Sequence, residues 1–195
     1  IFKKNRKNIS HLIVEKDNGI YDAINKGIKL SRGKVIGILN ADDIYFPGTL
    51  KLVNKYFSKN KIDYIFGSVL KERLMHGFWP HKIWYKFNVY PAHSCGFFLK
   101  KKIHDRLGLY DLNFKYSSDR DFIFRLINTK YRGISSKKNE VFGKFNPYGI
   151  SSRIGYLRIL LEEFRIRFKN QNFVVTFFVL FITLINKLYN LVFKK

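Results

Sequence analysis

The sequence predicts an α/β fold in which a mixed, mostly parallel sheet is flanked by helices. A helical pattern over residues 20–30 precedes an apolar strand pattern over 34–39, and a second helical pattern over 48–58 precedes another strand pattern over 63–70. Alternation at these lengths is typical of βαβ units. Ligands of such sheets bind at the carboxyl ends of the strands, so we expect a site directly after residue 39.

Composition limits the classes of protein that this chain can represent. Lys and Arg number 37 against 14 Asp and Glu, which gives a formal net charge of +23 over 195 residues. A hydrophobic content of 46% excludes a disordered basic chain. A single cysteine, Cys95, excludes a disulfide framework and a cysteine-rich zinc site. The charge indicates an anionic partner: nucleic acid, a membrane surface or an acidic substrate. The alternative to a specific anionic partner is that AT-rich codons favour lysine and the excess charge lies on a solvated surface.

The first predicted elements surround a turn-rich segment. Residues His11–Val14 are β-rich and predict a short buried strand, and a turn cluster over 15–19 follows. The helix over 20–30 has an apolar stripe, and Gly33 is expected to terminate it as its C′ residue. The strand over 34–39 then leads into Asn40-Ala41-Asp42-Asp43, and Pro47 suits the first turn of the next helix.

The second half of the chain is less regular. Residues 71–100 read as irregular and aromatic, and a turn follows at Gly108 and Asp111. Helices are expected over 119–128 and 153–169. We therefore divide the chain into an α/β domain over 1–150 and a helical tail over 151–195.

The acidic pair Asp42 and Asp43 allows two interpretations. Carboxylates after a strand are often solvated turn formers or helix caps. They are also the ligands that Mg²⁺ and Mn²⁺ prefer, together with substrate phosphates. A departing diphosphate gains negative charge, which a cation at this position would neutralise.

Several blocks of sequence together resemble the inverting family 2 glycosyltransferases, which have a GT-A fold. The blocks are 17–28, Gly33, 35–43 and 47–50, and the resemblance extends over roughly residues 11–128. It implies that the pair Asp42 and Asp43 serves the metal: Asp43 is the first choice as the metal ligand and Asp42 as a contact to the ribose or the metal's water ligands, with the reverse assignment left open. The family motif is often Asp-x-Asp, whereas this chain has Asn40 at the earlier position.

An inverting transfer needs a base that removes the proton of the acceptor hydroxyl. The resemblance places this base at the head of the helix over 119–128, with Asp119 as the first choice and Asp121 as the second. Arg125 follows one to two turns later as a contact to donor or acceptor. The structural alternative is that Asp119 only caps the helix.

The remaining site residues are also implied by the resemblance. His93 is expected to contact donor or acceptor, although a lone histidine is more often structural. Asp17, Asp22 and Asn25, together with Asp42, are expected to bind the nucleotide-sugar. The family's opening strand would precede Ile1 and is expected to be missing, so the chain is expected to be N-terminally truncated.

The tail contains 13 uncharged residues, 173–185, flanked by basic residues. A spanning helix needs about 20 apolar residues. A helix lying in the interface of an anionic membrane fits this pattern best, with packing against the domain or a full span as alternatives.

The sequence thus predicts a sugar transferase that uses Mn²⁺ or Mg²⁺ and a nucleotide-diphosphate sugar, most simply of the UDP type. Its acceptor would be a saccharide or lipid-linked, as in cell-surface polysaccharide synthesis, and it would lie at the cytoplasmic face of the cell membrane. The alternatives are an inactive membrane-associated remnant and a nucleic-acid-binding module. No helix-turn-helix, zinc-finger or RNA-binding signature supports the latter, so we expect no nucleic-acid partner.

Overall fold

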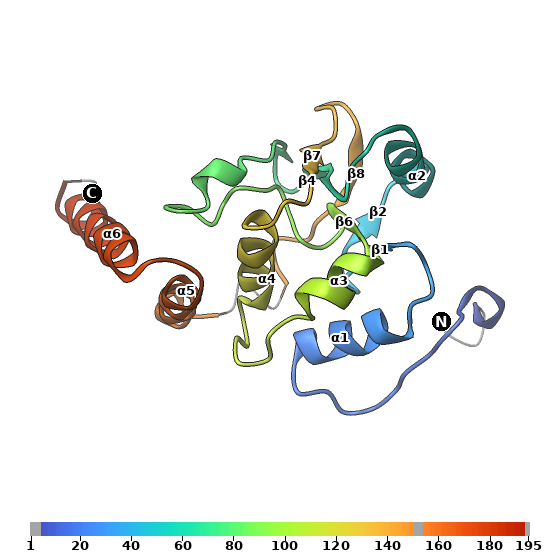
Figure 1. Ribbon diagram of the computed structural model, residues 1–195, viewed down its shortest axis with the longest axis horizontal. Helices are drawn as coiled ribbons and strands as arrows, with labels where there is room; N and C mark the ends of the chain where they lie inside the picture. The colour runs from blue at the N-terminus through green and yellow to red at the C-terminus, as the bar shows by residue number, and fades with distance from the viewer. Residues whose placement is uncertain (1–4, 150–153, 194–195) are drawn as a thin grey trace.

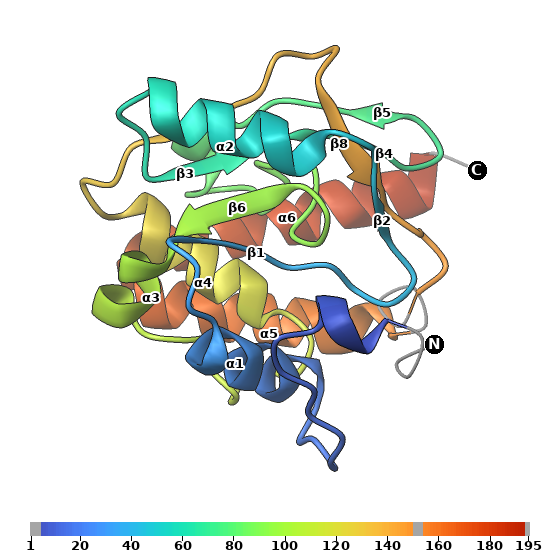
Figure 2. The same cartoon turned by 90° about the vertical axis from the view of Figure 1, so that its right-hand side faces the viewer.

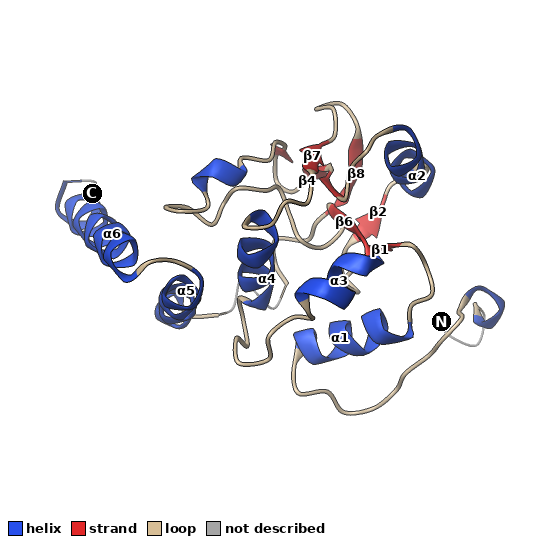
Figure 3. Ribbon diagram, in the orientation of Figure 1, coloured by secondary structure: helices blue, strands red, loops and turns tan. Residues whose placement is uncertain are grey.

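The computed structural model describes residues 5–149 and 154–193. Helices alternate with short strands that lie in the middle of the molecule (Figure 1, Figure 3). The helices are α1 (Ile20–Leu30), α2 (Thr49–Lys59), α3 (Lys101–Leu107), α4 (Ser118–Ile127), α5 (Tyr156–Asn170) and α6 (Phe173–Phe193), with 3-10 turns at Arg6–Asn8 and Pro80–Lys82. The strands are β1 (Val35–Gly37), β2 (Ile44–Tyr45), β3 (Tyr64–Phe66), β4 (Ser68–Leu70), β5 (Leu74–Met75), β6 (Phe97–Lys100), β7 (Gly133–Ser135) and β8 (Val141–Lys144).

The strands form two mixed sheets. The first has the order β1-β6-β3-β7 and the second the order β2-β8-β4-β5. The β3–β7 and β4–β8 pairs are parallel, whereas the other described pairs are antiparallel. The mixed α/β class is therefore confirmed, but parallel pairing does not predominate among the described strands. The reason is β6, which lies between β1 and β3 and runs against both.

Side-chain alternation along β3 divides the core into two layers. Tyr64 and Phe66 pack with α1, α3 and α4 on one face, whereas Ile65 packs with α2 on the other. This is the two-residue period of a strand buried on both faces. In Figure 2 α2 lies above the first sheet, and α1, α3 and α4 lie below it.

Several details of the sequence prediction need correction. Residues 11–14 form no strand and are exposed, because no described strand pairs with them. Gly33 does not terminate α1, which ends at Leu30 with an extended Ser31 as its C-cap. Pro47 precedes the N-cap Gly48 of α2 rather than lying in its first turn.

The predicted strand over 63–70 is interrupted at Gly67. A Cβ at Gly67 would lie 2.1 Å from the ring of Phe142, so the absence of a side chain permits this close approach. β6 and α3 lie where the sequence predicted irregular structure or a turn. β6 was missed because Phe97-Phe98-Leu99 shows no alternation of apolar and polar residues, since both faces of this strand are buried.

The two C-terminal helices differ in how they contact the domain. α5 packs against α4, and α6 follows it after a short break and packs against α5 (Figure 1). Residues 150–153, where the expected helix was to begin, lie outside the described residues. A search of the described chain finds no helix long and apolar enough to cross a membrane.

Candidate functional site

The loop after β1 is held beside the loop before β6. The backbone N–H of Asn40 donates to Ser94 Oγ at 2.9 Å, and the N–H of Cys95 donates to the Ile38 carbonyl at 3.0 Å. Cys95 has a φ of 53°, a left-handed value that is unusual for a residue other than glycine. The pairing of β1 with β6 therefore fixes the acidic loop against a constrained turn.

Asp42 and Asp43 differ in burial, although both carboxylates contact Asn146. Asp42 is exposed and lines a cleft of about 800 Å³ between α1 and β1, which we call the Asp42 cleft. Asp43 is buried, and its Oδ1 accepts the backbone N–H of Asn146 at 2.8 Å. Asp43 Oδ2 is buried and lacks a hydrogen-bond partner among the described residues.

An unpartnered buried carboxylate oxygen is costly unless a cation or donor completes its environment. Asp43 Oδ2 and the exposed Asp42 carboxylate therefore fit a hard cation that takes one or two protein carboxylates and obtains its other ligands from water and phosphate. The described chain contains no group of three or more His, Cys, Asp or Glu side chains able to hold a metal.

A second cavity adjoins the Asp42 cleft. It measures about 400 Å³, and its lining includes His93 and Asp119; we call it the Asp119 cavity. The two spaces share four lining residues: Ile20, Ile24, Asn40 and Phe145. Carboxylates from α4 and from the loop after β1 therefore face adjoining hollows, although they are distant in sequence.

Asp119 is half-buried in the first turn of α4, and both of its carboxylate oxygens have partners. Oδ1 accepts the hydroxyl of Tyr21 at 2.6 Å, and Oδ2 accepts the hydroxyl of Tyr90 at 3.2 Å. Ser117 occupies the N-cap position. The alternative that Asp119 serves only as a helix cap is therefore wrong.

Asp121 has a different environment, although it is two residues away. Its side chain is fully buried, and its Oδ2 lies 2.8 Å from Arg125 Nε. Oδ1 lies 3.1 Å from Lys169 Nζ and accepts Asn170 Nδ2 at 2.9 Å. Arg125 also donates to the carbonyls of Leu107 and Leu109, so both predicted residues are occupied in joining α4 to its neighbours.

His93, which the sequence predicted as a contact to donor or acceptor, lies in the lining of the Asp119 cavity. Its Nε2 is 2.6 Å from the hydroxyl of Tyr110, and burial lowers the pKa of its imidazole. The neighbouring Cys95 is inert, because burial raises the pKa of its thiol to about 12.

The three residues predicted near the nucleotide do not line either space. Asp17 and Asp22 both pair with Lys26, at 2.7 and 3.2 Å. The Asn25 side chain is buried and exchanges two hydrogen bonds with the backbone of Tyr110. The opposite face of α1, which carries Ile20 and Ile24, lines the cleft instead.

The sequence reasoning missed Tyr21, Tyr90 and Lys71. All three line the Asp119 cavity, and Lys71 Nζ lies 4.4 Å from the centre of the Phe145 ring. Burial lowers the pKa of Lys71, and no ion pair to it occurs in the described part of the chain. Aromatic residues ordinarily signal a core, so no sequence signal separated these tyrosines from the others.

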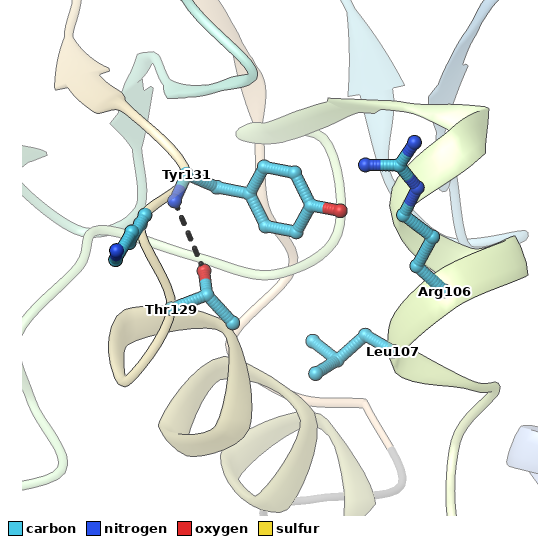
Figure 4. A pocket seen from close by; sticks show the side chains of 5 residues that line it. Arg106, Leu107, Thr129 and Tyr131 are labelled. Atoms are coloured by element: carbon cyan, nitrogen blue, oxygen red, sulfur yellow. Dashed lines mark hydrogen bonds between the residues drawn. The ribbon is translucent and has the colours of Figure 1, made fainter.

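A further hollow of about 420 Å³ lies between the end of α3 and the end of α4 (Figure 4). Its lining consists of Arg106, Leu107, Thr129, Lys130 and Tyr131. It contains no carboxylate and none of the predicted site residues. The predicted site residues that line a cavity are therefore those of the Asp42 cleft and the Asp119 cavity.

This combination of a mixed α/β fold and carboxylates at a strand end is that of the GT-A class. Residues 2–122 match the model of Glycosyl transferase family 2. An uncharacterised glycosyltransferase of Methanocaldococcus jannaschii is 31% identical over 179 residues, which is 83% of this chain and 58% of the relative. The chain belongs to glycosyl transferase family 2.

A further relative is also a glycosyltransferase, and solved structures of TarS share the fold. The PGL/p-HBAD biosynthesis glycosyltransferase of Mycobacterium bovis is 26% identical, with 68% of this chain and 53% of that protein covered. TarS from S. aureus, solved as residues 1–349 with UDP-GlcNAc, superposes with a TM-score of 0.61 at 13% identity over 84% of this chain and 56% of TarS. The UDP complex gives 0.60 at 13% identity over 84% and 49%. This chain thus spans little more than half the length of the relatives it matches.

Proposed function

We propose that this chain transfers a sugar from a nucleotide-diphosphate sugar to a hydroxyl of a saccharide or lipid-linked acceptor, with inversion at the anomeric carbon. The observation that supports this most directly is the position of Asp119 in a cavity that adjoins the Asp42 cleft. An in-line displacement needs a base on one side of the donor sugar and a neutralised diphosphate on the other.

In the proposed reaction Asp119 accepts the proton of the acceptor hydroxyl. The acceptor oxygen then forms a bond to the anomeric carbon as the bond from that carbon to the diphosphate oxygen breaks, and the nucleoside diphosphate leaves with the bonding pair. Asp119 is a better base than Asp121, because Asp121 is fully buried and engaged with Arg125, Lys169 and Asn170.

Asp42 and Asp43 would hold Mn²⁺ or Mg²⁺. When bound, the cation would neutralise charge on the diphosphate. Lys71 adds a positive charge to the same region, since it lines the Asp119 cavity and forms no ion pair with a carboxylate among the described residues. We propose Lys71 as a diphosphate contact. Asp17, Asp22 and Asn25 are better explained as the framework of α1 than as nucleotide ligands.

The solved TarS structures contain UDP and UDP-GlcNAc, which favours a UDP-sugar as the donor to try first. The mycobacterial relative is named for PGL/p-HBAD biosynthesis. A role in assembling a cell-surface saccharide or glycolipid is consistent with both.

We also propose that the chain binds the inner surface of the cell membrane, where a lipid-linked acceptor would be found. On α6, large apolar side chains recur every three to four residues and remain exposed: Phe173, Val174, Phe177, Phe178, Phe181, Ile182 and Ile185. A continuous apolar helix face on a chain with a net charge of +23 fits an anionic bilayer, which offers both hydrocarbon and negative charge.

Donor turnover tests the enzymatic part of the proposal. UDP release from a panel of UDP-sugars, UDP-GlcNAc among them, is measured with Mn²⁺ for the full chain and for Asp119→Asn, Asp43→Asn and Asp105→Asn. Asp105 is a matched control, because its exposed carboxylate pairs only with Lys101 among the described residues. We expect Asp43→Asn to lose Mn²⁺-dependent donor binding. Asp119→Asn should bind donor and lose turnover. Equal turnover in all four proteins would refute the proposal.

Vesicle flotation tests the membrane part. Vesicles with phosphatidylglycerol should carry the chain upward, and the double change Phe177→Glu and Phe181→Glu should abolish this. Leu50→Glu is the control, because Leu50 is an exposed apolar residue on α2. Flotation that is unaffected by the α6 double change, or an α6-dependent self-association in place of flotation, would contradict a membrane role.

A further inference from the structure

The carboxylate of Asp119 lies between two phenols that come from different parts of the chain. Tyr21 is in the first turn of α1, 98 positions before Asp119, and Tyr90 is in the segment before β6, 29 positions before it. Each phenol donates to a different carboxylate oxygen. A carboxylate held at both oxygens cannot rotate freely about its last side-chain bond.

Aromatic packing fixes the two phenols themselves. The Tyr21 ring stacks on the Tyr110 ring with centroids 5.7 Å apart, and Tyr110 in turn bonds His93. The Tyr90 ring stacks on Phe66 with centroids 5.0 Å apart. Rings that are stacked and largely buried lose rotamer freedom, so their hydroxyls occupy defined positions.

Both phenols remain donors over the whole working range of pH. Burial and the adjacent Asp119 charge raise the pKa of Tyr21 and of Tyr90 well above the ordinary value. A protonated phenol stabilises the ionised carboxylate that it bonds. An ionised carboxylate has about four lone-pair sites, so two phenols leave room for an acceptor hydroxyl.

We propose that Tyr21 and Tyr90 are positioning residues that orient Asp119 as the base, an inference that rests on the proposed function. The two phenols fix the carboxylate plane so that a free lone pair faces the Asp119 cavity. His93 acts indirectly, because it bonds Tyr110, whose ring stacks on the ring of Tyr21.

The test removes each hydroxyl and keeps the ring. Tyr21→Phe and Tyr90→Phe are compared with Tyr56→Phe, a matched control in which a phenol on α2 donates to the carboxylate of Glu140. UDP release is measured as a function of donor concentration. We expect kcat to fall about tenfold to a hundredfold in the two site variants, with donor KM unchanged.

A second measurement does not depend on turnover. Carboxyl-¹³C NMR of the aspartate-labelled chain identifies the Asp119 signal by its loss in Asp119→Asn. The chemical shift of this signal should differ from that of the unsubstituted chain in Tyr21→Phe and in Tyr90→Phe, but not in Tyr56→Phe. An unmoved signal or an unchanged kcat in both site variants would overturn the positioning role. By contrast, full turnover in Asp119→Asn would overturn the proposed function itself.

Discussion

Glu162 on α5 accepts the backbone N–H of Tyr116, with Oε2 at 2.9 Å, in the loop that leads into α4. Its Oε1 also accepts the N–H of Lys115 at 2.8 Å. Two residues that were expected to lie in different domains are thereby joined directly. α5 therefore supports the segment that presents Asp119, and only α6 extends beyond it.

Glu162→Ala should lower the free energy of unfolding by about 1–3 kcal/mol, because two part-buried hydrogen bonds from backbone N–H groups lose their acceptor. Glu163→Ala is the control, since the Glu163 ion pair with Arg120 is partly exposed and such pairs contribute about 0–1 kcal/mol. Urea denaturation of both variants checks this. An equal loss of unfolding free energy in the two variants would contradict a stabilising role of the Glu162 contacts beyond that of an exposed ion pair.

Asp121 and Asp119 should respond differently to the same substitution. Asp121→Asn leaves Arg125 and Lys169 without their buried carboxylate and should cost about 3–5 kcal/mol. Asp119→Asn should change the melting temperature little, because its half-buried amide can accept one phenol through Oδ1 and donate to the oxygen of the other through Nδ2. Thermal unfolding of both proteins measures the difference, and a greater loss in Asp119→Asn would reverse the assignment of structural and chemical roles.

Acid should destabilise the fold through His104. Burial lowers the pKa of His104 from 6.5 to about 4, and its ring stacks on Phe122 at 4.6 Å. Between about pH 4 and pH 6.5, His104 is therefore protonated in the unfolded chain and neutral in the folded chain. Stability is complete above about pH 6.5 and falls as pH drops toward 4, by about 3 kcal/mol.

Urea denaturation at pH 7 and pH 4.5 measures this loss, and His104→Phe should reduce it. The exposed His81 provides the control, because His81→Phe should keep the full pH dependence. A pH dependence that is identical in all three proteins would assign the acid sensitivity to other groups.

Two glycines should respond in opposite ways to alanine. A Cβ at Gly143 would lie 2.1 Å from the backbone oxygen of Ile44, which cannot move without breaking the β2–β8 pair. Gly143→Ala should therefore cost about 1–3 kcal/mol. Gly27→Ala meets nothing within 4 Å on α1 and should stabilise the helix by about 0.5–1 kcal/mol. Chemical denaturation measures both signs.

Local pattern predicted the helices well and the strands less well. α1, α2 and α4 follow from apolar periodicity, which each helix expresses within its own residues. β6 depends on two strands that are distant in sequence, and residues 11–14 find no partner although their composition suits a strand. Strand pairing is a long-range property, so composition alone did not identify it.

The candidate site shows the same division. Asp42, Asp119 and His93 line the adjoining spaces as the sequence indicated, because acidic loops and helix heads are local features. Tyr21 and Tyr90 join them only through packing between α1, α4 and the segment before β6. Asn25 was expected to bind the nucleotide, but its side-chain amide is hydrogen-bonded to the backbone of Tyr110 instead.

The position of β1 has a consequence for handling this protein. β1 pairs with β6 on one side, and among the described strands none pairs with its other edge. Free backbone amides and carbonyls on such an edge are a template for a strand from another molecule. Identical chains brought close together can satisfy each other's edges, so we expect self-association to rise with concentration and kinetic assays to be cleanest in dilute solution.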